Sequence, residues 1–250
     1  MENILVRLIG YKATVLHGDT AVFDRYTWLK KHLLPGPSRT LDAGCGSGAF
    51  TMYAAKIGNQ ATGISFDKRN NEIAAQRAKI LNIHNIKFID GDLRKLGEMS
   101  GTLGKFDQII CFETIEHILD DKKLIKDFSS LLKPDGRLLL TAPYKYSKHL
   151  YGDDKNLSTH EDGGHVRIGY THKEMADLLE KSGFKIQVLE YITGYISQQL
   201  INLQRILAKI NSKLAWLIIF PSRIFQFLDP VLAKIIDYPY LSIGIVAIKR

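Results

Sequence analysis

The chain has 250 residues, of which 45% are hydrophobic and 24% are charged, and its formal net charge is +8. This length and composition are typical of an ordinary globular chain with a full core and exclude a disordered or collagen-like one. The two cysteines, Cys45 and Cys111, fit neither a disulfide framework nor a metal-ligand spacing, so we expect a reducing, cytoplasmic location. A positive charge favours anionic partners, but the absence of an RNA-binding motif makes nucleic acid the least favoured of them.

Strand-like and helix-like segments alternate along most of the chain. Strands are expected at 39–44, 59–66, 86–93, 106–113, 134–144, 184–191 and 240–249, and helices at 49–58, 70–82, 115–132 and 173–183. Alternation of this kind predicts an α/β fold: a doubly wound, mostly parallel seven-stranded sheet whose last strand is antiparallel. Ligands bind at the carboxyl ends of such strands. We interpret the chain as a single domain with an N-terminal helical cover (1–37), a core (38–194 and 238–250) and a helical insertion (195–237).

A glycine-rich turn, LDAGCGSGAF at 41–50, follows the first predicted strand. No GK[ST] sequence follows it, which excludes a phosphate-binding loop of the Walker type. Binding of a nicotinamide dinucleotide usually requires an acidic residue after the second strand for the ribose hydroxyls, and Ser65 and Asp67 are at that place. The carboxylate of Asp42, just before the first glycine, would repel a pyrophosphate and would suit a cationic cofactor. S-adenosylmethionine carries an ammonium and a sulfonium group.

Five segments together resemble a known family. They are LDAGCGSG (41–48), GISFD (63–67), DGDL (90–93), FDQIICFETIEHI (106–118) and LLKPDGRLLLTAP (131–143). In this order and spacing they are similar to class I S-adenosylmethionine-dependent methyltransferases, which have a Rossmann-like fold, over about residues 38–190. The E-x-x-E-H pattern resembles the small-molecule branch that includes ubiquinone-pathway O-methyltransferases. GISFDKRN also resembles a branch that methylates lipid carbons.

The resemblance implies a role for each matching residue. Asp42 and the backbone of the glycine turn would hold the methionine end of S-adenosylmethionine, and Ser65 or Asp67 would meet its ribose. The family usually has an acid where Ser65 stands. Asp92 would accept a hydrogen bond from the adenine amino group beside Leu93. The expected cofactor-binding residues are Asp42, Gly44, Cys45, Gly46, Gly48, Ser65, Asp67, Asp92, Leu93, Phe112 and Glu113.

Transfer of a methyl group to a hydroxyl needs a base, and histidine is the usual one near neutral pH. His117 follows the fourth strand, close to where the reactive methyl should lie. The segment HEDGGHVRIGYTH (160–172) follows the fifth strand and supplies His160 and His165 as further candidates. A metal ion held by His160, Glu161 and His165 is disfavoured because no familiar ligand spacing occurs. We therefore expect no metal.

The insertion is apolar and basic. Apolar residues from Ile196 to Leu217 recur at three- and four-residue intervals, which predicts a helix over 196–217, and a second helix is expected at 223–236. The insertion would serve as a lid over the acceptor, a peripheral membrane contact or a homodimer seam. We favour the lid.

These observations predict a methyltransferase that acts on a small, apolar acceptor, at oxygen. The alternatives are a C-methyltransferase of a lipid, isoprenoid or polyketide, a sugar methyltransferase, and a non-catalytic scaffold that binds the cofactor.

Overall fold

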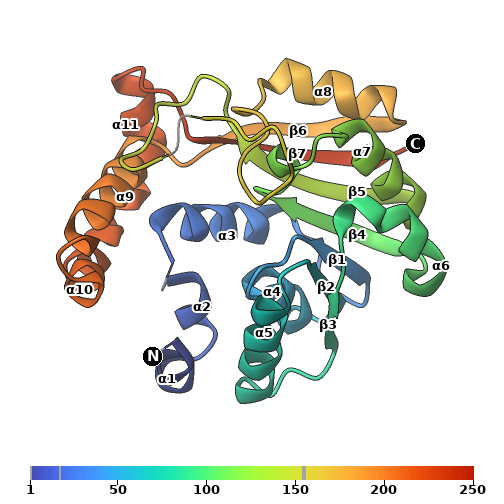
Figure 1. Ribbon diagram of the computed structural model, residues 1–250, viewed down its shortest axis with the longest axis horizontal. Helices are drawn as coiled ribbons and strands as arrows, with labels where there is room; N and C mark the ends of the chain where they lie inside the picture. The colour runs from blue at the N-terminus through green and yellow to red at the C-terminus, as the bar shows by residue number, and fades with distance from the viewer. Residues whose placement is uncertain (1, 17, 154–155) are drawn as a thin grey trace.

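The computed structural model describes residues 2–16, 18–153 and 156–250, which form one seven-stranded sheet with helices on both faces (Figure 1). The order of the strands is β3-β2-β1-β4-β5-β7-β6. Their bounds are β1 Arg39–Ala43, β2 Gln60–Ser65, β3 Ile86–Asp90, β4 Phe106–Phe112, β5 Leu132–Pro143, β6 Phe184–Ile192 and β7 Ser242–Lys249.

Strands β1 to β5 pair in parallel, whereas β7 lies antiparallel between β5 and β6. The sequence-based expectation of a mostly parallel seven-stranded sheet with an antiparallel last strand is confirmed. The strand order switches sides at β1, because β2 and β3 lie on one side of it and β4 and β5 on the other. The turns after the parallel neighbours β1 and β4 therefore meet at the carboxyl edge. That edge is where an open α/β sheet binds its ligands.

Alternate residues of the strands belong to two apolar clusters, one on each face of the sheet. One cluster packs Leu41, Ile109 and Leu140 against α7 (Asp121–Leu131) and α8 (His172–Lys181). The other packs Ile110 and Leu139 against α3 (Thr20–His32) and α4 (Ala49–Lys56). A further helix, α5 (Lys68–Ile80), follows β2 and contacts both β2 and β3.

Two predicted elements differ from the structure after β3 and β4. The expected helix 115–132 is a 3-10 turn, η2 (Ile115–His117), followed by α7. The break occurs because Asp120 caps α7: its carboxylate accepts a hydrogen bond from Lys123 N (2.9 Å). The strand expected to reach residue 93 ends at Asp90, and η1 (Leu93–Met99) and α6 (Ser100–Leu103) follow.

The N-terminal segment and the insertion are both helical and pack against each other. Helices α1 (Glu2–Ile9) and α2 (Lys12–Leu16) precede α3, and α3 contacts α9 (Tyr195–Ala208). The expected helix 196–217 is wrong in one respect: it ends at α9, and α10 (Ser212–Ser222) begins after Asn211, whose side chain caps it. The expected helix 223–236 is η3 (Arg223–Leu228) followed by α11 (Asp229–Ile235).

Candidate active site

The glycine turn after β1 leaves one glycine open and packs the other two tightly. Gly44, Gly46 and Gly48 all have positive φ, which favours glycine. A Cβ at Gly44 would clash with the Thr114 side chain, and one at Gly48 would lie 2.8 Å from both Ala74 and Phe88. Nothing lies within 4 Å of a Cβ at Gly46. The turn therefore presents bare backbone to open space at Gly46, as a closely held cofactor requires.

Asp42 lies at the carboxyl end of β1 and is only 2% exposed. Its Oδ2 accepts a hydrogen bond from Thr51 Oγ1 (2.6 Å), a residue that the sequence analysis did not single out. Burial raises the pKa of Asp42 to about 7, against the lowering effect of the Thr51 contacts. An uncompensated carboxylate in this position is costly, so a nearby cation would stabilise its charged form.

Cys45 is buried beside the turn, with its Sγ 3.7 Å from Asn71 Oδ1. Burial, and next the charge of Asp42, raise the pKa of the Cys45 thiol. The contribution that Cys45 can make to a bound cofactor is therefore its backbone.

The ends of β2 and β3 are joined through Asn71 of α5. Its Nδ2 donates to Ser65 O (3.1 Å), Ile89 O (3.0 Å) and Asp90 Oδ1 (2.7 Å). Ser65 is buried, whereas Asp67 caps α5 by accepting a hydrogen bond from Arg69 N (2.9 Å). Sequence reasoning missed Asn71, because nothing in its helical context indicates that it spans two strand ends.

Asp92 and Leu93 stand at the start of η1. Asp92 accepts from Arg94 Nε (2.8 Å) and Nη2 (2.6 Å), and these hydrogen bonds lower the pKa of Asp92. Leu93 is buried. An adenine contact at Asp92 would share this carboxylate with Arg94, so the adenine role stays a prediction.

Phe112 and Glu113 end β4 and meet α3. The Phe112 ring packs against Trp28 (5.7 Å between centroids) and Phe50 (5.1 Å). Glu113 has a φ of +45° and forms an ion pair with Arg25 Nη1 (3.2 Å). Ser242 Oγ donates to the same carboxylate oxygen (3.2 Å). Arg25 comes from the predicted N-terminal cover, so no sequence signal connected it with the site.

Glu116, His117 and His165 form a cluster beside Glu113. One ligand atom from each lies within 4.8 Å of the others, and His117 Nε2 is 3.8 Å from Glu116 Oε1. The His117 Nδ1–H donates to Gly164 O (3.0 Å), which leaves the Nε2 lone pair directed at the cluster. The rings of His117 and His165 meet edge to face at 4.7 Å.

The buried carboxyl of this cluster is electrostatically unusual. Glu116 is 1% exposed, and its Oε2 has no hydrogen-bond partner among the described residues. Burial, and next the charge of Glu113, raise the pKa of Glu116 well above its usual range. Loss of hydration, and next His117, lower the pKa of His165. Shifts of this kind at a strand end are typical of functional sites.

His160 stands apart from this cluster. It is exposed, its Nδ1 contacts Thr159 Oγ1 (2.8 Å), and it is not among the residues that line the neighbouring cavity. Glu161 instead anchors the loop, because its carboxylate accepts from Leu119 N (2.7 Å) and Arg94 Nη1 (3.3 Å). Of the three residues weighed as a metal set, only His165 belongs to the cluster.

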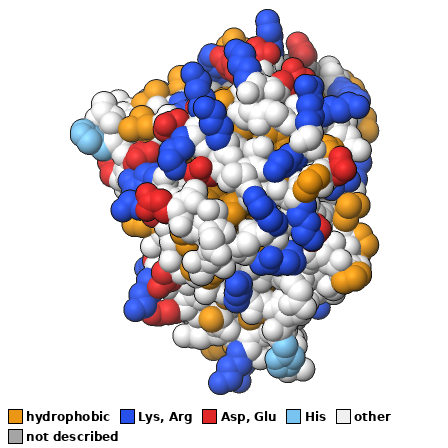
Figure 2. Space-filling model, turned by 90° about the vertical axis from the view of Figure 1, so that its right-hand side faces the viewer, with side chains coloured by type: hydrophobic (Ala, Val, Ile, Leu, Met, Phe, Trp, Pro, Cys, Tyr) orange, Lys and Arg blue, Asp and Glu red, His pale blue; other side chains and the backbone are white. Residues whose placement is uncertain are grey.

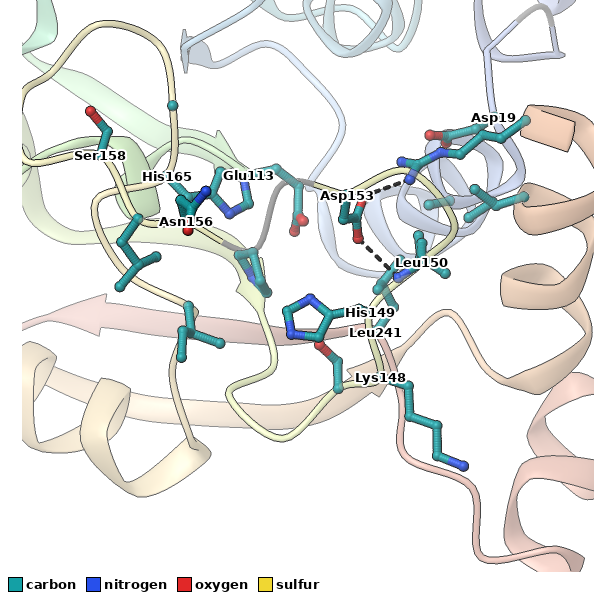
Figure 3. Close-up of a pocket in the computed structure, with 18 of the residues that line it drawn as sticks. Asp19, Glu113, Lys148, His149, Leu150, Asp153, Asn156, Ser158, His165 and Leu241 are labelled. Atoms are coloured by element: carbon teal, nitrogen blue, oxygen red, sulfur yellow. Dashed lines mark hydrogen bonds and ion pairs between the residues drawn. The ribbon is translucent and has the colours of Figure 1, made fainter. Parts of the chain in front are cut away.

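A cavity of about 560 Å³ opens next to Glu113 and His165. Figure 3 shows these two side chains next to each other, with Asp153 between Glu113 and the more distant Asp19 in this view. Its walls come from α3, the loop after β5, and α9. The lining mixes charged side chains with apolar ones, namely Ala21, Pro143, Leu150, Leu157, Ile168, Ile201 and Leu241. This volume suits a small molecule.

Comparisons with known proteins agree with this geometry. A family model described as a methyltransferase domain matches residues 20–189. A ubiquinone biosynthesis O-methyltransferase from Xanthomonas axonopodis pv. citri is 30% identical over 121 residues, which are 47% of this chain and 48% of that protein. Its counterpart from Haemophilus ducreyi is 38% identical over 105 residues, or 41% and 44%. The alignments thus span about half the length of these relatives.

Solved structures share the fold. The N-methyltransferase NodS from Bradyrhizobium japonicum, in complex with S-adenosylhomocysteine, has a TM-score of 0.58 at 16% identity, covering 94% of this chain and 90% of that one. The cyclase SpnF has a TM-score of 0.60 at 20% identity, covering 90% and 81%. The open glycine turn and the acidic strand ends fit S-adenosylmethionine, and the family model covers more than half of the chain. The chain therefore belongs to the methyltransferase-domain family and has the fold of the class I S-adenosylmethionine-dependent methyltransferases.

Proposed function

We propose that the protein methylates a hydroxyl oxygen of a small acceptor bound in the cavity beside Glu113. The observation that carries this proposal is the cluster of Glu116, His117 and His165 at the carboxyl end of β4. Thr114, between Glu113 and the cluster, packs against Gly44 of the glycine turn. Cofactor loop and candidate base are therefore neighbours.

The cluster contains imidazole nitrogens that can accept a hydroxyl proton. S-adenosylmethionine, when bound, supplies the electrophilic methyl group. His117 Nε2 has a free lone pair because Nδ1–H is held by Gly164 O. Loss of hydration lowers the pKa of His165, which favours the neutral imidazole, and burial raises the pKa of Glu116, which favours its neutral carboxyl. Of these two histidines, His165 lines the cavity and is therefore the one placed to take the proton as methyl transfer proceeds, and His117 contacts its ring.

The cavity favours an acceptor with both polar and apolar parts. Arg25, Lys148 and Arg205 line it together with Leu150 and Ile201. An amphipathic acceptor, such as a phenol or acid with a hydrocarbon portion, would match this lining better than a wholly apolar one. The names of the curated relatives support transfer to oxygen. A sugar acceptor remains an alternative because of the charged lining. C-methylation also needs a base to take the proton that the acceptor carbon loses, so the product and not the histidines distinguishes it from O-methylation.

The test is release of S-adenosylhomocysteine with panels of phenols, polyols and prenylated quinols. We expect His117→Asn or His165→Asn to reduce kcat by about 10²–10⁴-fold, the usual contribution of a general base. The affinity for S-adenosylmethionine should not change. His160→Asn is the matched control from the same loop and should keep full activity. Full activity of both His117→Asn and His165→Asn would contradict the proposal, and methylated carbon in the product would replace it with C-methylation.

The same cluster suggests a second version of this chemistry. A buried carboxyl and two histidines fit a divalent cation, and the hydrogen bond from His117 to a backbone carbonyl is the arrangement that orients metal-ligating histidines. A cation there would act as a Lewis acid on the acceptor hydroxyl. Metal analysis of the purified protein and activity after chelation distinguish the two versions. A general base alone predicts no bound metal and no loss of activity.

A further inference from the structure

The insertion between β6 and β7 has its apolar side chains outside. In Figure 1, α9, α10 and α11 lie together at one end of the molecule, beside α3. Helices α10, η3 and α11 form one helical run from Ser212 to Ile235. Twelve large apolar residues between Ile210 and Ile236 are more than a third exposed, including Leu217 (63%), Phe227 (74%) and Ile235 (73%). We call this surface the insertion face.

The inner side of the same run is polar. Gln226 Nε2 donates to Thr20 O (3.2 Å), Asp24 Oδ1 (2.9 Å) and Ser197 Oγ (3.0 Å). Asp229 accepts from the backbone amides of Ile196 (2.6 Å) and Ser197 (2.9 Å). These bonds fix which side of the run faces the protein. The apolar side chains therefore cannot turn inward without breaking a buried hydrogen-bond network.

This arrangement is the reverse of an ordinary water-exposed helix, which hides its apolar stripe. Figure 2 shows the opposite end of the molecule, where Lys, Arg, Asp and Glu side chains are interspersed and hydrophobic ones occur in small groups. Contiguous exposed apolar surface of the size of the insertion face marks an interaction site.

The charges around the insertion face indicate its partner. Lys213 and Lys234 are exposed on the run, and Lys209 is exposed just before it. The one acidic residue between 195 and 236, Asp229, is buried. Asp237, just past the run, is exposed, but Lys209, Lys213 and Lys234 outnumber it, so a second copy of the chain would mainly bring lysines toward lysines. An anionic lipid surface would pair with the lysines and receive the apolar side chains.

The polar residues of the run fit a position along a membrane surface better than a position across the bilayer. Ser212–Ile235 is long and apolar enough to span a bilayer by length and composition, with a mean hydropathy of 1.3. Crossing would place Arg223, Gln226 and Asp229 in hydrocarbon without the groups of Gly18, α3 and α9 that now bind them. We propose that the insertion face docks flat onto an anionic lipid bilayer, with its apolar side chains in the interfacial layer and its lysines at the headgroups.

Docking in this way would bring the cavity close to the bilayer. Ile201 and Arg205 of α9 line the cavity, and α10, η3 and α11 pack on α9 from outside. Helix α9 and the run itself, each about 10 Å across, therefore separate the cavity from the insertion face. The docking itself does not depend on the methyl acceptor or on the proposed base.

The test is cosedimentation of the full chain with vesicles of phosphatidylcholine alone or mixed with phosphatidylglycerol. We expect binding to the mixed vesicles, weakened by high salt. Phe227→Glu and Ile235→Glu should each weaken it by about tenfold or more, because each removes a large apolar side chain from the bilayer. Lys213→Gln and Lys234→Gln should each weaken it about fivefold, and only on anionic vesicles.

Leu189→Glu, at an exposed position of β6 outside the insertion, is the matched control and should bind as the unaltered protein does. Binding of S-adenosylhomocysteine by each variant establishes that it is folded. Absence of vesicle binding by the unaltered protein would overturn the proposal. So would a dimer in analytical ultracentrifugation that Phe227→Glu dissociates, if vesicles do not compete with it.

Discussion

At the scale of single residues, the molecule keeps carboxyl groups in places that disfavour their charge. Burial raises the pKa of Asp42, at the glycine turn, and of Asp24, under the insertion, to about 7 in both cases. Each is therefore a proton-binding site of the folded protein near physiological pH. Asp42 lies at the expected cofactor site and Asp24 does not, so a substitution at one serves as a control for the same substitution at the other.

Binding of a cationic cofactor near Asp42 should release a proton. The cation would lower the pKa of Asp42, so the affinity for S-adenosylmethionine should rise with pH up to about 7 and then level off. Calorimetry near pH 6 in buffers of different ionisation enthalpy should report the released proton. Asp42→Asn should abolish the release, whereas Asp24→Asn should keep it. An unaltered protein that binds without proton release would show that Asp42 does not sense the cofactor.

Asp24 should make stability depend on pH. Its pKa is about 7 in the folded protein and near 3.8 when unfolded, so the folded state alone keeps the proton between these values. Raising the pH through this window therefore lowers the free energy of unfolding. Asn cannot titrate and keeps an acceptor for Gln226. Relative to the unaltered protein, Asp24→Asn should gain about 2–4 kcal/mol in free energy of unfolding between pH 4 and pH 8.

Denaturant unfolding of both proteins at several pH values measures this difference. Asp42 titrates in both proteins, so its contribution cancels. If the difference in free energy of unfolding stays constant with pH, the pKa of Asp24 is the same in the folded and unfolded states and is not raised by folding.

At the scale of elements, the glycine turn separates packing from binding. Gly48→Ala would bring a Cβ to 2.8 Å from Ala74 and Phe88, and overpacking of this kind costs about 1–3 kcal/mol. Gly46→Ala meets no atom, so its cost in stability should be the backbone strain alone, about 1 kcal/mol. We expect Gly46→Ala to lose cofactor affinity with little change in Tm, and Gly48→Ala mainly to lower Tm. Calorimetry and thermal unfolding would contradict this if the pattern were reversed.

The sequence was sufficient to predict the elements whose residue pattern fits a single type of local structure. Buried strands such as 106–112 contain an apolar run, here IICF at 109–112, and the glycine turn is recognised by the spacing of its glycines. The helix expected at 115–132 was wrong because apolar spacing continues across Ile115 and Ile118, while the cap at Asp120 decides where α7 begins. Three-residue apolar spacing is common to 3-10 and α-helical turns, so periodicity alone cannot separate them.

Other features of the site depend on contacts between distant segments. Arg25 and Glu113 pair across 88 positions of sequence, and Asn71 joins the ends of two strands from a helix that also buries Ala74 and Ala78. The insertion shows the same limit on a larger scale. Its apolar stripe was visible in the sequence, but periodicity does not say whether such a stripe faces a core or the outside. Only the structure shows that Gln226 and Asp229 bind α3 and α9, which leaves the apolar stripe on the outside.

At the scale of the whole molecule, α9 stands between two surfaces with different ligands. The carboxyl edge of the sheet and the cavity lie on one side of it, and the insertion face lies on the other. A ligand at the carboxyl edge should slow amide exchange in the strand-end turns, and a bilayer should slow it in α10, η3 and α11. The two patterns of slowed exchange should be separable, because each ligand contacts only one of the two regions.

Hydrogen exchange with each ligand alone tests this arrangement. S-adenosylhomocysteine should protect amides at 44–49, 65–67, 91–94 and 112–117, and should leave 210–236 nearly unchanged. Anionic vesicles should protect 210–236 and leave the strand-end turns unchanged. Phe227→Glu should keep the first pattern and lose the second, because its substitution lies outside the cofactor residues. Protection of 210–236 by S-adenosylhomocysteine without vesicles would instead show that the insertion closes over the site, which would favour the lid interpretation over a membrane contact.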